Sequence, residues 1–186
     1  DPQQPERVGE WLLEESMNAH GEHIRYQYET RHGQCYLRRI HYGNFEAQAN
    51  LYAWATSGTA DVQWHFELLF DYGVLSTRLT EKPVPVQKAW PERSDTFSSF
   101  VFGFQSDTRH LCRQVLMYHH FPEETGTDPT LVRRLLLEYR QSTLGYQQLS
   151  AAHDQAFDES ARIDSRPPVE FGYSEFKCPD PAQAWQ

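Results

Sequence analysis

The sequence predicts an all-β fold, an antiparallel meander of about eight or more strands that forms an extended curved sheet or a sandwich-like arrangement with little helix. Apolar and aromatic residues recur at alternate positions in several short runs, which is typical of strands with a buried face. Turn residues separate these runs. Strands do not alternate with long helical patterns, so the sequence does not indicate a doubly wound α/β fold.

The first two predicted strands are VGEWLLEES (8–16) and HIRYQYET (23–30). The second run alternates large apolar residues with polar ones, which indicates a strand with one buried face. The intervening turn contains Gly21, and turns favour glycine. Residues 8–30 are therefore predicted to form a hairpin.

Two further strands are predicted over CYLRRIHYGN (35–44) and VQWHFELLFDYG (62–73), with a loop or irregular edge over 45–61. Successive side chains of a strand point to opposite sides, so the second run is predicted to have two distinct faces. One face carries Trp64, Phe66, Leu68 and Phe70, and the other carries His65, Glu67 and Leu69.

The middle of the chain is predicted to be a connector followed by two strands. Residues 76–95 contain three prolines, each of which removes a backbone donor, so this segment is expected to run extended between strands. FSSFVFGFQS (97–106) is predicted as a strand with three phenylalanines on one face. It leads directly into RHLCRQVLMYHHF (109–121), also interpreted as a strand.

The last third contains a turn-rich loop over 121–130 and a segment, LVRRLLLEYRQS (131–142), that fits a helix and a strand almost equally well. Residues 146–163 are polar, and part of them is predicted to be a disordered loop. PPVEFGYSEF (167–176) is predicted as the final strand. We expect one all-β segment over residues 1–178, followed by a frayed tail over 179–186.

The composition excludes several classes of protein. The net charge of −9 disfavours binding to nucleic acids and to anionic membranes, because both need a basic surface. No apolar run approaches the roughly 20 residues that cross a bilayer, and no signal peptide is present. The chain begins at Asp1 without methionine, so we expect it to be a piece of a larger protein.

The cysteines do not predict a disulfide framework or a zinc knuckle. Cys35, Cys112 and Cys178 are far apart in sequence, three cysteines cannot all pair within one chain, and no CxxC motif occurs. We expect three free thiols.

The stretch 109–121 is the first candidate for a metal site, because it holds one cysteine and three histidines. On a strand, His119 and His120 point to opposite faces and cannot bind one ion together. Cys112 and His120 share a face, but a rise of about 3.3 Å per residue separates them by roughly 26 Å. Only His110 and Cys112 are close on one face, and two ligands are a weak signal. We expect no metal site.

Catalytic groups are also weakly indicated. Cys112 lies near Arg109 and Arg113, which would lower the pKa of a nearby thiol, but a strand directs adjacent side chains away from it. Glu67 and Glu170 are two of 26 acidic residues, so their pairing for glycoside hydrolysis is not a specific signal. We expect no catalytic residues.

Ligand-binding motifs give no stronger signal. The sequence contains neither GxGxxG nor GxxxxGK[ST], so no phosphate-binding loop or cofactor site is predicted. A basic group is interpreted as partners of the abundant carboxylates; its members are Arg31, Arg38 and Arg39. Three tryptophans would suit stacking against sugar rings but are more often core residues in β proteins; they are Trp54, Trp64 and Trp90.

Several runs resemble one family, the SpvB-like N-terminal region of toxin-complex B components and related SpvB–Rhs-type toxin proteins. They are DPQQPERVGEWLLEES, CYLRRIHYGN, WHFELLFDYG, WPERSDTFSSFVFGFQSDTRHLCRQVLMYHHFPEE and RPPVEFGYSEF, in the family's order. The resemblance spans residues 1–176 but corresponds to only the latter half of the region. Thr96 and His110 depart from the family's usual proline and tyrosine, the loop after Tyr28 is short, and residues 141–163 match poorly.

The resemblance implies a structural role without catalysis. In the family, the B component joins a C-type Rhs subunit in a hollow β-rich shell that encloses a toxic effector, and a transferase, where present, occupies a separate C-terminal domain. We therefore expect an assembly module of a secreted toxin, with the other domains of the parent protein and a C-type Rhs subunit as partners, and with no membrane insertion by this segment. The alternative is a carbohydrate- or receptor-binding β module of the same toxin.

We predict that the isolated chain self-associates, because a sheet separated from its neighbours exposes strand edges and apolar patches. Static light scattering over a concentration series is expected to show an average mass that rises with protein concentration. A monomer with no concentration dependence would contradict this prediction.

Overall fold

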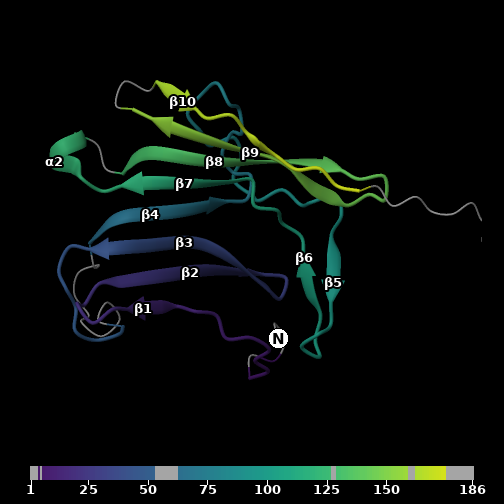
Figure 1. The fold of residues 1–186 in the computed structure, drawn as a ribbon. Coiled ribbons are helices and arrows are strands. Elements are labelled where there is room, and N and C mark those ends of the chain that lie inside the picture. Colours follow the sequence, from purple (N-terminus) through teal and green to yellow (C-terminus); the bar gives the residue numbers. More distant parts are fainter. Residues whose placement is uncertain (1–3, 5, 53–62, 127–128, 159–161, 175–186) are drawn as a thin grey trace, which may run out of the picture.

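The computed structural model describes residues 4, 6–52, 63–126, 129–158 and 162–174. Within them, nine strands pair into one antiparallel sheet in the order β1-β2-β3-β4-β7-β8-β9-β10, with β11 also paired to β9, and β5 pairs with β6 (Figure 1). In chain order the elements are β1 (Glu15–Met17), β2 (His23–Arg31), β3 (Gln34–Asn44), β4 (Trp64–Asp71), β5 (Phe97–Ser99), β6 (Ser106–Thr108), β7 (Gln114–His119), α2 (Pro122–Thr125), β8 (Thr130–Gln141), β9 (Gln147–Phe157), β10 (Ile163–Ser165) and β11 (Val169–Glu170). The all-β prediction is confirmed, and the sheet does not close into a barrel.

The first half of the sheet follows the sequence closely from β2 onward. The predicted strands 23–30 and 35–44 correspond to β2 and β3 within one residue. The tight turn between them has positive φ at both His32 (51°) and Gly33 (76°), as hairpin turns of type I′ require. The predicted strand 8–16 is largely wrong, because β1 covers three residues only. Just before β1, the carbonyls of Glu14 and Leu13 still accept hydrogen bonds from Tyr26 and Tyr28 of β2, whereas Gly9 lies against Phe102.

The second half of the sheet contains two segments that the sequence did not settle. The ambiguous segment 131–142 is a strand, β8, because β7 and β9 pair with it on both sides. Most of the polar segment 146–163, part of which was expected to be a disordered loop, is ordered, since residues 147–157 form the eleven-residue strand β9. Its polar residues are compatible with a strand because Gln155, for example, is buried and accepts a hydrogen bond from Arg134 Nε at 2.9 Å.

The prediction of a continuous strand over 97–106 is also wrong. Residues 97–99 and 106–108 are the two strands of a separate hairpin, β5–β6, and the phenylalanines occupy its turn, where Phe100 is exposed. The turn includes Gly103 at a φ of 76°. The hairpin meets the turn between β2 and β3 through a hydrogen bond from the Asp107 amide to the His32 carbonyl. Alternating phenylalanines therefore did not indicate one continuous strand here, because the chain reverses direction between residues 99 and 106.

Three other boundaries differ from the predictions. Only the second half of 109–121 is strand, since β7 begins at Gln114. The loop 121–130 includes the single helical turn α2. The last predicted strand, 167–176, is reduced to the two residues of β11. The predicted tail over 179–186 lies outside the described residues.

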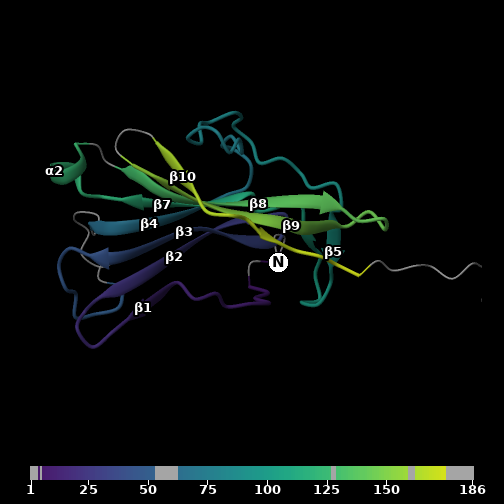
Figure 2. The same cartoon turned by 45° about the horizontal axis from the view of Figure 1, so that its top comes forward.

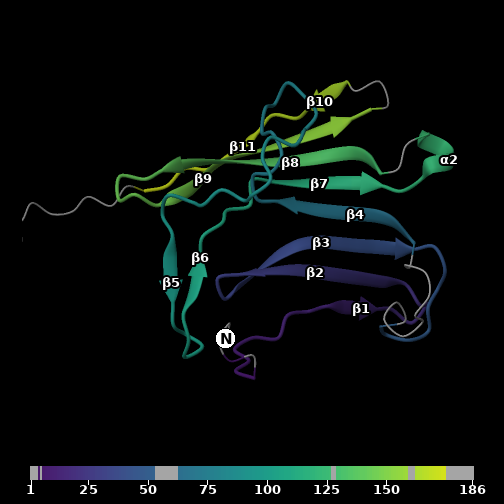
Figure 3. The ribbon, with the colours of Figure 1, turned by 180° about the vertical axis from the view of Figure 1, so that it is seen from behind.

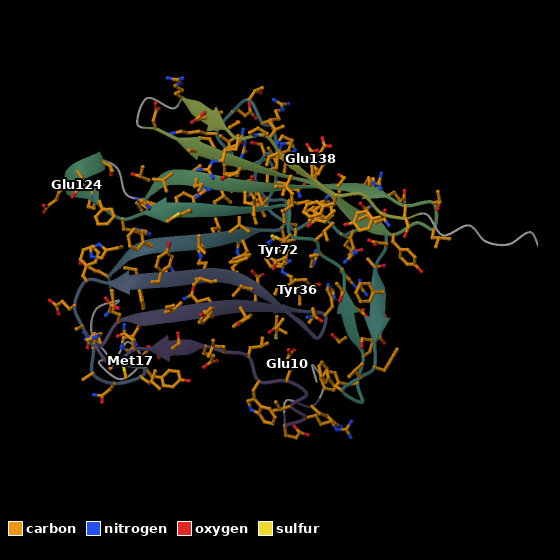
Figure 4. The ribbon with its side chains drawn as sticks, in the orientation of Figure 1. Glu10, Met17, Tyr36, Tyr72, Glu124 and Glu138 are labelled. Atoms are coloured by element: carbon orange, nitrogen blue, oxygen red, sulfur yellow. The ribbon has the colours of Figure 1, made fainter. Side chains whose placement is uncertain are left out.

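Residues 72–96, here called the connector, join β4 to β5 and cross one face of the sheet. Figure 3 shows this segment in front of β7, β8 and β9, and Figure 2 shows it standing above the twisted sheet. It has one strand-like bridge, between Leu75 and Pro85, as expected of an extended proline-rich segment. Its end carries Trp90, which is buried against Tyr36 and Tyr72. These two tyrosines lie together in Figure 4, with ring centroids 5.3 Å apart.

The strand register divides the large sheet into two different faces. We call the side under the connector the covered face and the other side the open face. Every buried strand residue of the large sheet lies on the covered face: Glu15, His23, Tyr36, Glu67, Asp71, Gln114, Leu116, Arg134, Leu136, Ala151, Gln155 and Phe157. The open face carries Tyr26, Ile40, Tyr42, Phe66, Leu68, Val115, Met117 and Leu135, none of which is buried.

Because the two faces differ in burial, the same substitution on each face of β8 is expected to lower the free energy of unfolding by different amounts. Leu136→Ala is expected to lower the free energy of unfolding by about 2–5 kcal/mol, because Leu136 is 2% exposed under the connector and its loss leaves a cavity. Leu135→Ala, at 41% exposure on the open face, is expected to cost well under half as much. Urea denaturation of both variants measures the difference, and equal losses would contradict the assignment of the faces.

Candidate functional site

A group of ionisable side chains surrounds Glu67 on the covered face. Strand β4 places this carboxylate in the middle of the sheet, and it is only 6% exposed. The register sets His41 of β3 on one side of it and Tyr118 of β7 on the other. We call Arg39, His41, Glu67, Tyr118 and His120 the Glu67 cluster.

The Glu67 carboxylate is the centre of the charges in this cluster. Arg39 donates to its Oε1 atom. Its Oε2 atom lies 3.4 Å from His120 Nε2 and 3.8 Å from His41 Nε2. The cluster therefore contains one anion, one permanent cation and two imidazoles whose charge depends on pH.

Burial determines the protonation of the neighbours of Glu67. It lowers the pKa of His41, an effect that the Glu67 carboxylate opposes and that Arg39, Arg25 and His120 reinforce. Burial also raises the pKa of Tyr118, assisted by Glu67. At neutral pH, His41 is therefore mainly uncharged and Tyr118 keeps its proton.

The two adjacent histidines of RHLCRQVLMYHHF point to opposite faces, as predicted. The ring of His119 lies 5.0 Å from the ring of Phe66, on the open face. His120 approaches Glu67 on the covered face, and its amide donates to the carbonyl of His65 at 2.9 Å. Both histidines therefore contact β4, each on a different side.

His110 and Cys112, the close pair of the sequence analysis, precede β7 and do not act together. His110 packs against Tyr36 and Trp90, and its Nδ1 atom lies 3.0 Å from the carbonyl oxygen of Pro91. The Cys112 thiol donates to the Gln114 carbonyl, and burial raises its pKa to about 11. Cys112 is therefore a protonated thiol at neutral pH rather than an activated nucleophile.

Other proposed pairs are separated or have structural partners. Glu67 and Glu170 lie four strand positions apart, about 19 Å at the usual strand spacing, so they cannot act on one glycosidic bond. The basic residues have separate partners, Glu29 for Arg31, the Phe70 carbonyl for Arg38 and Glu67 for Arg39. Among the described residues, no group of three or more histidine, cysteine, aspartate or glutamate side chains is arranged to hold a metal ion.

The tryptophans do not form one platform. Trp90 is 6% exposed and stacks on Tyr72 at 4.3 Å. The ring of Trp64 lies 5.9 Å from His41, beside Glu67, whereas His65 stacks with Phe45 and Phe121. The predicted alternation of faces therefore fails at the start of β4. Trp54 lies outside the described residues.

A buried polar network under the connector was not predicted from the sequence. The Arg134 guanidinium donates to the carbonyl of Arg78 at 2.9 Å and to the side chain of Gln155. Gln155 donates to the carbonyl of Leu79, and Gln114 donates to Asp71 at 3.0 Å. Polar residues in a predicted strand are normally assigned to solvent, so the sequence held no signal for this network.

The pKa of His41 predicts that acid destabilises the fold. Its pKa is lower in the folded than in the unfolded chain, so the unfolded chain binds more protons as the pH falls below about 6.5. The stability is fully present above that pH and is lost toward the lowered folded value, with a slope of at most about 1.4 kcal/mol per pH unit for one proton.

Denaturation midpoints between pH 7.5 and 5 are expected to fall for the natural chain and to fall less steeply for His41→Asn. The matched control is His20→Asn, at an exposed position. An unchanged pH slope in His41→Asn, with the native circular dichroism spectrum retained, would contradict the assignment.

Comparison with known proteins places this arrangement among bacterial toxins. The family model described as "Salmonella virulence plasmid 65kDa B protein" matches residues 1–34 and 29–121. The mono(ADP-ribosyl)transferase SpvB of Salmonella typhimurium (strain 14028s) is 42% identical over 178 residues, which cover 85% of this chain and 29% of the relative. The chain thus spans less than a third of the length of the curated relatives it matches.

Solved structures agree with this match. The N-terminal domain of the effector protein SpvB from Salmonella typhimurium strain LT2 is 42% identical and superposes with a TM-score of 0.71, over 80% of this chain and 51% of that domain. The TcdB2–TccC3 complex is 35% identical with a TM-score of 0.77, over 90% of this chain and 9% of that chain. The Photorhabdus luminescens Tc holotoxin pore is 36% identical, with a TM-score of 0.75. The match covers 89% of this chain and 9% of that chain.

In the described part of the chain, no helix is long and apolar enough to cross a membrane. The family model covers more than half of the chain, and the curated relatives and solved structures extend the match to 80–90% of it. This chain belongs to the SpvB family.

Proposed function

We propose that this chain is a non-catalytic assembly module of a toxin-complex B component or SpvB/Rhs-like protein. It contributes strands to a β-rich shell that encloses a toxic effector and helps to deliver it. The observation that carries this proposal is the match of nearly the whole chain to part of the TcdB2–TccC3 complex. The partners are the other domains of the parent toxin and a C-type Rhs subunit, and the parent is secreted.

The chemistry of the covered face supports the absence of catalysis. The Cys112 thiol keeps its proton at neutral pH. The Glu67 carboxylate is bound by Arg39, and the Arg134 guanidinium by main-chain carbonyls and Gln155. These polar groups are therefore engaged in holding strands and connector together, rather than turned toward a substrate.

The alternative, a carbohydrate- or receptor-binding module, has less support. It relies on tryptophans that can stack against a sugar ring, and Trp90 is buried in the core. Trp64 packs beside His41. Binding on a glycan array that disappears in Trp64→Ala would favour this alternative over the assembly module.

The assembly role predicts that breaking this sheet opens the shell. In the natural B-type polypeptide, co-expressed with its C-type Rhs subunit, Leu136→Asp is expected to make the enclosed effector sensitive to added protease. A charge at this buried position disrupts the sheet under the connector. The measurement is the half-life of the intact effector on a gel after protease is added. This half-life is expected to shorten about tenfold or more, because the effector is no longer enclosed.

The matched control is Thr77→Asp, which adds the same charge at an exposed position of the connector. It is expected to leave the effector as protected as in the natural complex. Full protection in Leu136→Asp, once the isolated variant chain is shown to unfold, would contradict the proposed role.

A further inference from the structure

The open face is a continuous apolar surface across the middle strands of the sheet. One cross-strand row runs from Tyr26 through Ile40 and Leu68 to Met117, on β2, β3, β4 and β7. In the next row Tyr42 stacks on Phe66, with ring centroids 5.0 Å apart. Figure 1 looks onto this face, and no other segment of the described chain lies in front of these four strands.

The exposures show that, apart from Phe121 beside Phe66 at one end, no segment of the described residues covers this surface. A side chain on a flat sheet is partly shielded by its four neighbours, so an uncovered apolar face has intermediate exposures throughout. A second layer on top removes the remaining exposure. Under the connector, Leu116 and Leu136 are only 0% and 2% exposed. The adjacent Leu135, on the open face, keeps 41%.

An apolar face of this width is not typical of a sheet side that faces water. Antiparallel sheets with one solvated side alternate apolar and polar residues, and here β4 and β7 carry large apolar residues on both sides. The five strands from β2 to β8 span about 19 Å at the usual strand spacing. This is wide enough for a second sheet or a pair of helices.

The apolar surface has a polar border on the side of β8 and β9. On β8 and β9 the same face carries the ion pair of Arg133 with Asp154, and Arg166 lies 3.6 Å from the same carboxylate. The surface that requires a partner is therefore limited to β2, β3, β4 and β7 and the adjoining part of β8.

The related structures indicate which partner has the right size. This chain covers 51% of the solved N-terminal domain of SpvB, so about half of that domain lies outside the region shared with this chain. That domain therefore contains a second length of polypeptide comparable to the region shared with this chain. The relatives thus supply, within one polypeptide, enough chain for another layer.

We propose that the open face is the contact surface for the remaining half of its own SpvB-like domain, which packs an apolar layer onto β2, β3, β4 and β7. The sheet is then the middle of three layers, between the connector and this second half. The inference rests on the proposed function in one respect, that the chain is part of a longer toxin polypeptide.

The test compares the accessibility of the open face in the 186-residue chain and in the longest polypeptide encoded by its reading frame. Met117→Cys reports on the open face and Thr77→Cys, at an exposed position of the connector, is the matched control. Both are made in a background with the native cysteines replaced, Cys35→Ser, Cys112→Ala and Cys178→Ser. The rate of labelling by a water-soluble maleimide is measured for each under native conditions.

We expect Met117→Cys to react about tenfold or more slowly in the longer polypeptide, because labelling there requires local opening. Thr77→Cys is expected to react equally fast in both. Equal rates for Met117→Cys, or a reading frame that encodes nothing beyond this chain, would overturn the proposal. Protection that appears in the isolated chain and grows with its concentration would assign the face to a second copy and overturn it as well.

The outcomes also separate this inference from the proposed function. If Met117→Cys is labelled freely in the longer polypeptide while the effector stays protected from protease, the contact is wrong and the assembly role stands. If Met117→Cys is protected while Leu136→Asp leaves the effector enclosed, the contact stands and the assembly role is wrong.

Discussion

The covered face depends on the buried guanidinium of Arg134, which holds the connector to the sheet. Its hydrogen bonds to the Arg78 carbonyl and to Gln155 join the connector to β8 and β9, and Gln155 in turn donates to Leu79. A buried charge is tolerated only where such partners replace water. Because the connector is fixed at this point, Leu116 and Leu136 are removed from solvent beneath it.

The same constraint makes the sheet asymmetric. One short proline-rich segment cannot cover both sides, so the connector and the region around Trp90 bury one face and leave the other without a layer. Polar groups gather on the covered face, where Glu67 and Asp71 are bound by Arg39 and Gln114. Apolar side chains without polar partners gather on the open face. This asymmetry agrees with the proposed role of the chain as one layer of a larger assembly.

The sequence located the paired strands best where alternation and turn residues agreed. β2 and β3 were predicted within one residue because alternation and turn residues delimit each run, whereas the His32–Gly33 turn that joins them is seen only in the structure. The segment 97–106 alternates equally well, yet it reverses at its phenylalanines. β9 lacks an apolar period and is nevertheless a strand, because β8 supplies hydrogen-bond partners along its length. Local pattern therefore failed where the pairing of strands, and not the apolar period of one segment, decides the structure.

The sequence by itself determined the all-β class, the resemblance to the SpvB family and the opposite orientation of His119 and His120, since strand geometry and residue order suffice for these. Only the tertiary structure decided that 131–142 is a strand, that His41, Glu67 and His120 meet, and that Cys112 is a buried, protonated thiol. It alone also showed which face of each strand is covered. The physical reason is that burial and strand pairing are set by contacts between distant segments, and the period of a strand states only that its two faces differ.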